Sequence, residues 1–165
     1  MQLRPATVAD LPAIDDIFNH YVRTSPCIYA LEPLPAAERA AWFAQHDAAH
    51  PVLVVEAAGA VIGWGALSSY NSRGGYRFTV EDSLFVHPEH QRRGLGRLLL
   101  EALVREAKAI GHHAILAVID AEHEASVALH RAFGFEPVAH LKEVGFKFDR
   151  WRDVVFLQRL CDQQK

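Results

Sequence analysis

One short segment restricts the fold of this chain more than any other: residues 91–97 read Gln-Arg-Arg-Gly-Leu-Gly-Arg. A strand-like run ends before it at Val86, and apolar residues recur after it at helical spacing. Gly94 and Gly96 allow close approach to the backbone, and the first amides of a helix are unpaired at the positive end of its dipole. The arginines, Arg92, Arg93 and Arg97, add fixed cations suited to a pyrophosphate. The sequence therefore predicts a strand-to-helix junction that binds an anion.

Residues 91–97 have three other interpretations besides an anion site. An ordinary strand-to-helix turn with solvated arginines has the same residues and stays open. A dinucleotide-binding turn is excluded because the third glycine is missing and three predicted strands precede the segment. A nucleotide phosphate loop is excluded because no Gly-Lys-Ser/Thr follows.

The remaining patterns predict an α/β fold with a sheet of mixed direction. Apolar runs indicate strands at 52–57, 61–67, 76–86, 114–119, 135–141 and 154–160. Helical spacing indicates helices from Leu11 to about Arg23, Pro35 to about His46, Gly94 to about Gly111, and Ser126 to Phe133. The proline-rich stretch 24–35 is predicted to be a loop that flanks a substrate site.

Composition limits the class of protein. Apolar runs stay below the roughly 20 residues of a membrane helix, and the N-terminus lacks a secretory or lipidation pattern. We therefore expect one domain over residues 1–165, in the cytoplasm and without membrane binding. A net charge of −3 argues against nucleic acid as a partner. Two distant cysteines, Cys27 and Cys161, give neither a disulfide scaffold nor zinc spacing.

Gln91, Gly94 and Gly96 match the pattern Gln/Arg-x-x-Gly-x-Gly/Ala of the GNAT superfamily of acetyltransferases, which the chain resembles over almost its full length. It is most similar to the branch of phosphinothricin and methionine sulfoximine/sulfone acetyltransferases, through segments 3–6, 18–20, 51–54, 75–81, 86–88, 125–130 and 144–151. The resemblance implies the GNAT fold: a mixed, mostly antiparallel sheet of about seven strands with about four helices. It also implies transfer of an acetyl group from acetyl-CoA to a primary amine.

The resemblance implies a cofactor site on both sides of the turn. The backbone of Leu84, Phe85 and Val86 would pair with the pantetheine amides like an added strand. The pyrophosphate would be held by the backbone amides of the next segment: Arg92, Arg93, Gly94, Leu95, Gly96 and Arg97. His123 stands where the branch has asparagine, and we expect its imidazole to keep an altered cofactor contact.

Two ionisable residues are implied as catalytic. Glu81 would draw a proton from the substrate ammonium, directly or through water. His130 stands where many members have a tyrosine that protonates the coenzyme A thiolate, and histidine can act as an acid near neutral pH. A backbone N–H near Val86 would stabilise the oxyanion. The alternative for Glu81 is an exposed strand carboxylate without a catalytic role. The alternative for His130 is a histidine that only packs on its helix.

The acceptor is expected to be an amino acid or an analogue such as phosphinothricin or methionine sulfoximine/sulfone. Arg73 and Arg77, the nearest cations before Glu81 in the sequence, would bind the carboxylate of the acceptor. The alternative is that both arginines are only surface charges. Tyr29 occupies a position where the branch has tryptophan, in the region expected to bind the acceptor. Acetylation of a protein N-terminus or lysine, and a sensory module that binds acetyl-CoA without catalysis, stay open.

The resemblance further implies a homodimer formed through the C-terminal segment. Its aromatic residues supply contact area or belong to the core: Phe146, Phe148, Trp151 and Phe156. No metal is expected, since the histidine pairs at 87 and 90 and at 112 and 113 lack a cysteine or carboxylate cluster to complete a zinc site.

Overall fold

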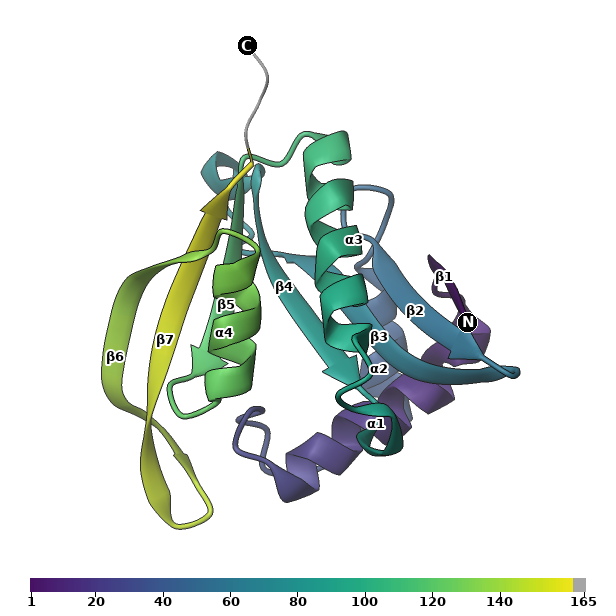
Figure 1. The fold of residues 1–165 in the computed structure, drawn as a ribbon, viewed down its shortest axis with the longest axis horizontal. Coiled ribbons are helices and arrows are strands. Elements are labelled where there is room, and N and C mark those ends of the chain that lie inside the picture. The colour runs from purple at the N-terminus through teal and green to yellow at the C-terminus, as the bar shows by residue number, and fades with distance from the viewer. Residues whose placement is uncertain (162–165) are drawn as a thin grey trace.

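The computed structural model describes residues 1–161, which form one seven-stranded sheet in the order β1-β2-β3-β4-β5-β7-β6 (Figure 1). The strands are β1 (Gln2–Pro5), β2 (Val52–Ala57), β3 (Ala60–Ser69), β4 (Thr79–Val86), β5 (Ala114–Asp120), β6 (Glu136–Lys147) and β7 (Arg150–Leu160). The α-helices are α1 (Leu11–Thr24), α2 (Ala36–Ala44), α3 (Leu95–Ile110) and α4 (Glu124–Ala132). The predicted α/β fold is confirmed.

Helices cover both faces of the sheet, because side chains along a strand alternate between its faces. Val54 of β2 and Trp64 of β3 belong to the core beneath α1. Leu53 and Leu67, from the same two strands, belong to the core beneath α3. In Figure 1, α3 and α4 lie in front of the sheet, with α1 and α2 behind it. This double cover explains why the central strands are nearly continuous apolar runs.

Helix α3 begins and ends at glycines. Its buried residues follow helical spacing: Leu95, Leu99, Leu100, Ala102, Leu103 and Ala107. Gly94 precedes it with φ +80°, and Gly111 follows with φ +97°. Both angles lie in the left-handed region, which glycine adopts without a Cβ clash.

Several predicted boundaries are corrected by the structure. Strand β1 was not predicted. Strand β4 begins at Thr79 and not at the predicted residue 76, because residues 74–76 form a 3-10 turn. Strands β6 and β7 extend far beyond the predicted 135–141 and 154–160 and form a long antiparallel hairpin. Its turn is Phe148-Asp149, with φ of +53° and +56° at residues that give no glycine signal.

The feature that positions the site is a gap in the sheet between β4 and β5. These parallel strands pair only from Thr79 to Glu81 and from Ala114 to Leu116. Beyond these residues they diverge, as Figure 1 shows, while β5 stays paired with β7 along its full length.

Candidate functional site

A cavity of about 900 Å³ lies where β4 and β5 diverge. Both predicted catalytic residues, Glu81 and His130, line it. So do six of the residues predicted to bind the cofactor: Leu84, Phe85, Val86, Arg92, Gly96 and His123. Helices α1, α2 and α4 supply further walls. Segments separated by half of the chain are therefore brought to one site.

The edge of β4 that faces the gap can accept an added strand. Hydrogen bonding alternates along an antiparallel ladder, and His87 N–H donates to the Ile62 carbonyl oxygen at 2.9 Å. The alternation turns the backbone groups of Leu84 and Val86 away from β3 and toward the gap. Consistently, the Tyr21 hydroxyl donates to the Val86 carbonyl oxygen at 2.6 Å. This edge fits the amides of pantetheine.

The turn before α3 fits an anion. Arg92 and Gly94 have φ of +56° and +80°, and left-handed residues in such a turn aim successive N–H groups at one point. The first intrahelical bond runs from the Leu98 N–H to the Gly94 carbonyl oxygen at 3.0 Å. The amides of residues 95–97 therefore have no helical acceptor and lie at the positive end of the dipole. This geometry suits a pyrophosphate.

Other predicted cofactor residues have side chains engaged elsewhere. Leu95 is buried in the core. Arg93 lies beside His90, with 3.3 Å between Nη1 and Nδ1, and the Arg97 guanidinium lies 5.2 Å from the centre of the Phe133 ring. The group that Leu95 offers to a ligand is thus its backbone N–H.

His123 lies at the N-cap position of α4 and lines the cavity. Burial lowers its pKa, the charge of Asp120 opposes this, and the charge of His130 adds to it. A neutral imidazole has one N–H to donate. The residue therefore retains the chemistry needed for the altered contact that we expected.

Glu81 is a half-buried carboxyl group where the pairing of β4 and β5 ends. Phe85, four residues along the same strand, packs against Trp64 and Phe18. Since alternate residues share a face, Glu81 faces the layer of α1. Burial, and secondly the charge of Asp82, raise the pKa of Glu81 above its ordinary value. Such a carboxyl group suits general base chemistry.

His130 lies on the other face of the sheet, and both ring nitrogens have protein partners. Nδ1 is 2.8 Å from the Ser126 carbonyl oxygen, and Nε2 is 3.0 Å from Oδ2 of Asp82. Burial by itself lowers the pKa of His130, but the hydrogen bond and charge of Asp82 and the Ser126 carbonyl outweigh it and raise the pKa. The histidine therefore lies in an ion-pair geometry that the sequence did not predict.

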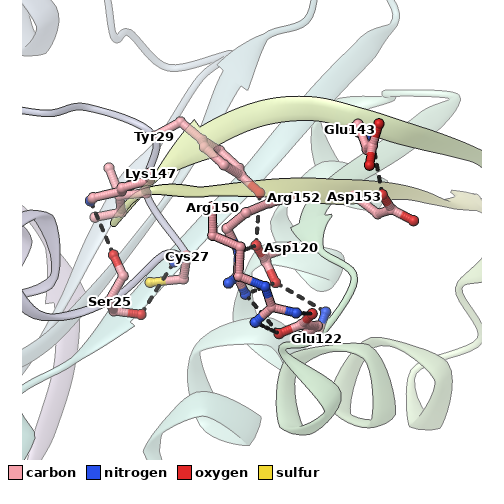
Figure 2. Close-up of polar contacts among 11 residues, drawn as sticks. Ser25, Cys27, Tyr29, Asp120, Glu122, Glu143, Lys147, Arg150, Arg152 and Asp153 are labelled. Atoms are coloured by element: carbon pink, nitrogen blue, oxygen red, sulfur yellow. Dashed lines mark hydrogen bonds and ion pairs between the residues drawn. The ribbon is translucent and has the colours of Figure 1, made fainter.

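The residues predicted to bind the acceptor are not among those that line the cavity. The Tyr29 hydroxyl donates to Oδ2 of Asp120 at 2.7 Å, and Arg152 Nε donates to the same oxygen at 2.6 Å (Figure 2). Arg73 and Arg77 are exposed on either side of the 3-10 turn that precedes β4. Nη1 of Arg77 donates to the Gly74 carbonyl oxygen at 3.1 Å.

Lys147 holds the loop that follows α1 and was not predicted. The residue is 3% exposed, and Nζ donates to the carbonyl oxygens of Val22 (2.7 Å), Ser25 (3.0 Å) and Ile28 (2.6 Å). Figure 2 shows it above Ser25 and Cys27. Since Cys27 and Ile28 line the cavity, Lys147 fixes one of its walls.

Two further groups in the cavity wall gave no local sequence signal. The buried Arg39 guanidinium lies 4.7 Å from the centre of the Phe18 ring and 4.6 Å from that of Trp42. Tyr21 connects α1 to the glycine turn, because its hydroxyl accepts from Gln91 Nε2 at 2.6 Å. Both arrangements depend on contacts between distant segments.

Within residues 1–161, no group of three or more histidine, cysteine, aspartate or glutamate side chains is arranged to hold a metal ion. Across the same residues, no helix is both long enough and apolar enough to span a membrane.

Comparison with known proteins gives a consistent result. The acetyltransferase (GNAT) family matches residues 14–135. The L-amino acid N-acyltransferase MnaT of Escherichia coli is 42% identical over 165 residues, covering 99% of this chain and 96% of that protein. An L-methionine sulfoximine/L-methionine sulfone acetyltransferase of Salmonella typhimurium is 40% identical over 164 residues, covering 99% of this chain and 96% of that protein.

The structure of a GNAT superfamily phosphinothricin acetyltransferase from Sinorhizobium meliloti, in complex with acetyl-CoA, has a TM-score of 0.93 at 40% identity. The match covers 97% of this chain and 88% of that one. The chain therefore belongs to the GNAT family of N-acetyltransferases, which use acetyl-CoA as cosubstrate, as the sequence predicted.

Proposed function

We propose that this protein acetylates the primary amine of a small amino acid or analogue, such as phosphinothricin or methionine sulfoximine/sulfone. One observation carries the proposal: a single cavity joins the free edge of β4 at Leu84 and Val86 to the carboxyl group of Glu81. The edge fits the cofactor, and Glu81 faces the α1 layer, where an amine can approach it. The names of the relatives support the same class of acceptor.

In the proposed reaction, acetyl-CoA supplies an activated thioester. The amides of 92–97 and the edge of β4 hold and orient it. Glu81 removes a proton from the substrate ammonium, directly or through water, so that a neutral amine attacks. A backbone N–H facing the gap near Val86 donates to the oxygen that gains charge. His130 returns a proton to the departing thiolate.

From the resemblance we assign the carboxylate of the acceptor to Arg73 and Arg77, which are exposed before β4 and do not line the cavity, because the carboxylate of a free amino acid needs a cation as its partner. Tyr29 is assigned to the neighbouring wall. The resemblance to the branch supports these assignments, and the loop of Tyr29 reaches the cavity through Cys27 and Ile28. We place the reaction in the cytoplasm.

We also propose a homodimer. Apolar side chains on the β6–β7 hairpin are about half exposed: Val144 (54%), Phe146 (49%), Phe148 (57%) and Trp151 (58%). An apolar cluster of this kind is typical of an interface. Size-exclusion chromatography with light scattering is expected to give twice the chain mass, and a monomer at high concentration would contradict the proposal.

The acceptor class is tested by thiol release from acetyl-CoA with a panel of amines. The panel contains L-phosphinothricin, methionine sulfoximine, methionine sulfone, ordinary amino acids and a peptide. Turnover of a free amino acid or analogue, with little for the peptide, is expected. Preference for the peptide would favour a protein N-acetyltransferase. A rise in melting temperature with acetyl-CoA and no turnover would favour a sensory module.

A further inference from the structure

The Asp82–His130 pair is the most buried charged contact that lines the cavity. The side chain of Asp82 is 1% exposed and that of His130 is 4% exposed. Oδ2 of Asp82 lies 3.0 Å from Nε2, while Oδ1, also buried, has no hydrogen-bond partner among residues 1–161. The Phe135 ring meets the imidazole edge to face, with 5.1 Å between ring centres.

The contacts of the imidazole define where its protons lie. The Ser126 carbonyl oxygen, 2.8 Å from Nδ1, can only accept, so Nδ1 carries a hydrogen. Nε2 faces a carboxylate oxygen, and that contact needs a second hydrogen between the two atoms. Both contacts are satisfied only when the pair holds one proton more than a neutral imidazole beside a carboxylate.

We propose that Asp82 is a positioning residue that keeps His130 doubly protonated at the cavity wall, ready to supply the proton that the departing thiolate needs. This inference rests on the proposed function. It adds a residue that the sequence analysis did not single out, and it explains how a buried histidine can be charged. The raised pKa of His130 is in accord with the geometry.

The arrangement separates the base from the acid. Glu81 and Asp82 are consecutive on β4, so their side chains project to opposite faces of the sheet. Glu81 faces the layer of α1, whereas Asp82 meets His130 of α4. One strand therefore carries the group that accepts the proton of the amine and the group that holds the proton for sulfur.

Each proton that moves in this step has a donor and an acceptor. Glu81 passes the first proton of the ammonium to solvent, and as the C–N bond forms it takes a second proton from the attacking nitrogen, which becomes the amide nitrogen. As the C–S bond breaks, its electron pair goes to sulfur, which takes the proton held between Nε2 and Oδ2 as that contact opens, directly or through a water molecule. Neutral His130 and the Asp82 carboxylate remain. Solvent returns a proton to the pair and removes one from Glu81.

Other charged groups around the pair enter the titration. Glu81 and Asp82 interact through their charges, as do His123 and His130. Arg97 of α3 and Arg159 of β7 contact Phe133, which follows α4, and the charge of Asp120 of β5 acts on His123. A substitution at Asp82 leaves the other five charged groups in place, so the change that it produces reports on the carboxylate at residue 82.

The test is an NMR titration of the His130 ring nitrogens from about pH 5 to about pH 10, with the signal assigned from His130→Gln. Asp82→Asn is isosteric, and its amide N–H can donate to Nε2, which leaves the ring neutral. The midpoint is expected to fall by about one unit or more in Asp82→Asn and to be partly restored in Asp82→Glu.

Asp153→Asn is the matched control. Its carboxylate forms the same type of contact with His140, 2.7 Å from Nε2, but the side chains of His140 and Asp153 are 52% and 34% exposed. This variant is expected to leave the His130 midpoint and the pH profile of turnover unchanged. The alkaline limb of kcat in Asp82→Asn is expected to move to lower pH with the midpoint.

The outcomes separate this inference from the proposed function. An unchanged His130 midpoint in Asp82→Asn overturns the inference, as does a shifted midpoint with an unshifted alkaline limb. A panel without turnover overturns the proposed function, and the spectra alone then show whether Asp82 keeps His130 charged.

Discussion

Replacing Gly145 by alanine is predicted to disrupt the contact between the β6–β7 hairpin and the loop beside the cavity. A Cβ at this position would lie 2.2 Å from Cε1, 2.7 Å from Cδ1 and 2.8 Å from Cζ of Tyr29. Restoring ordinary contact, at 3.4 Å or more, requires the ring to move by about 1.2 Å. Overpacking of this kind costs about 1–3 kcal/mol.

The movement also stretches the hydrogen bond between the Tyr29 hydroxyl and Asp120, now 2.7 Å long. Hydrogen bonds to charged groups contribute about 1.5–3 kcal/mol. Because Tyr29 is only partly buried, we expect Gly145→Ala to lower the free energy of unfolding by about 2–4 kcal/mol in total. Urea denaturation followed by fluorescence measures this loss.

A double-mutant cycle identifies the cause. In a Tyr29→Ala background the alanine at 145 has no ring to displace, so its effect is expected to fall below about 1 kcal/mol. Gly75→Ala is the control, because an added Cβ there meets no atom within 4 Å. Equal losses in both backgrounds, or a loss no greater than that of the control, would refute the argument.

Two further predictions concern the buried Lys147 and the half-buried Glu81. Lys147→Met leaves three carbonyl oxygens without their donor and is expected to lower the free energy of unfolding by about 2–4 kcal/mol. In the same urea assay, the control Lys142→Met, at an exposed position, is expected to leave the free energy of unfolding nearly unchanged. Glu81→Gln is expected to raise the melting temperature at pH 8, because burial raises the folded-state pKa of Glu81 above 4.5 and its charged form disfavours folding. That gain should vanish toward pH 4, where the carboxyl group is protonated in both states, and a gain independent of pH would contradict this reasoning.

The parts of the fold that follow from local pattern were predictable from the sequence. The limits of α3 follow from Gly94 and Gly111, whose left-handed backbone favours glycine. The turn of the β6–β7 hairpin was not predictable, because Phe148 and Asp149 adopt positive φ without glycine or asparagine. Pairing along the hairpin imposes this conformation, and the residues next to the turn do not predict it.

The site was predictable where it depends on the backbone. Gly94 and its neighbours form the turn, and the resemblance placed the cofactor along β4. The polar contacts were not predictable, because they join distant residues: Asp82 to His130 across 48 positions, and Lys147 to Val22 across 125. Such partners depend on how the sheet brings its strands together, and the periodicity of apolar residues in the sequence does not predict this arrangement.

The central claim is that the cofactor binds along the β4 edge and that Glu81 acts as the base. It is tested most directly by measuring, in one preparation, acetyl-CoA affinity by calorimetry and kcat by thiol release. The comparison is between wild type, Glu81→Gln and the exposed control Glu101→Gln. We predict unchanged affinity in all three and a kcat lower by about 10²-fold or more in Glu81→Gln alone. A Glu81→Gln variant that turns over an accepted amine at the wild-type rate would contradict the account.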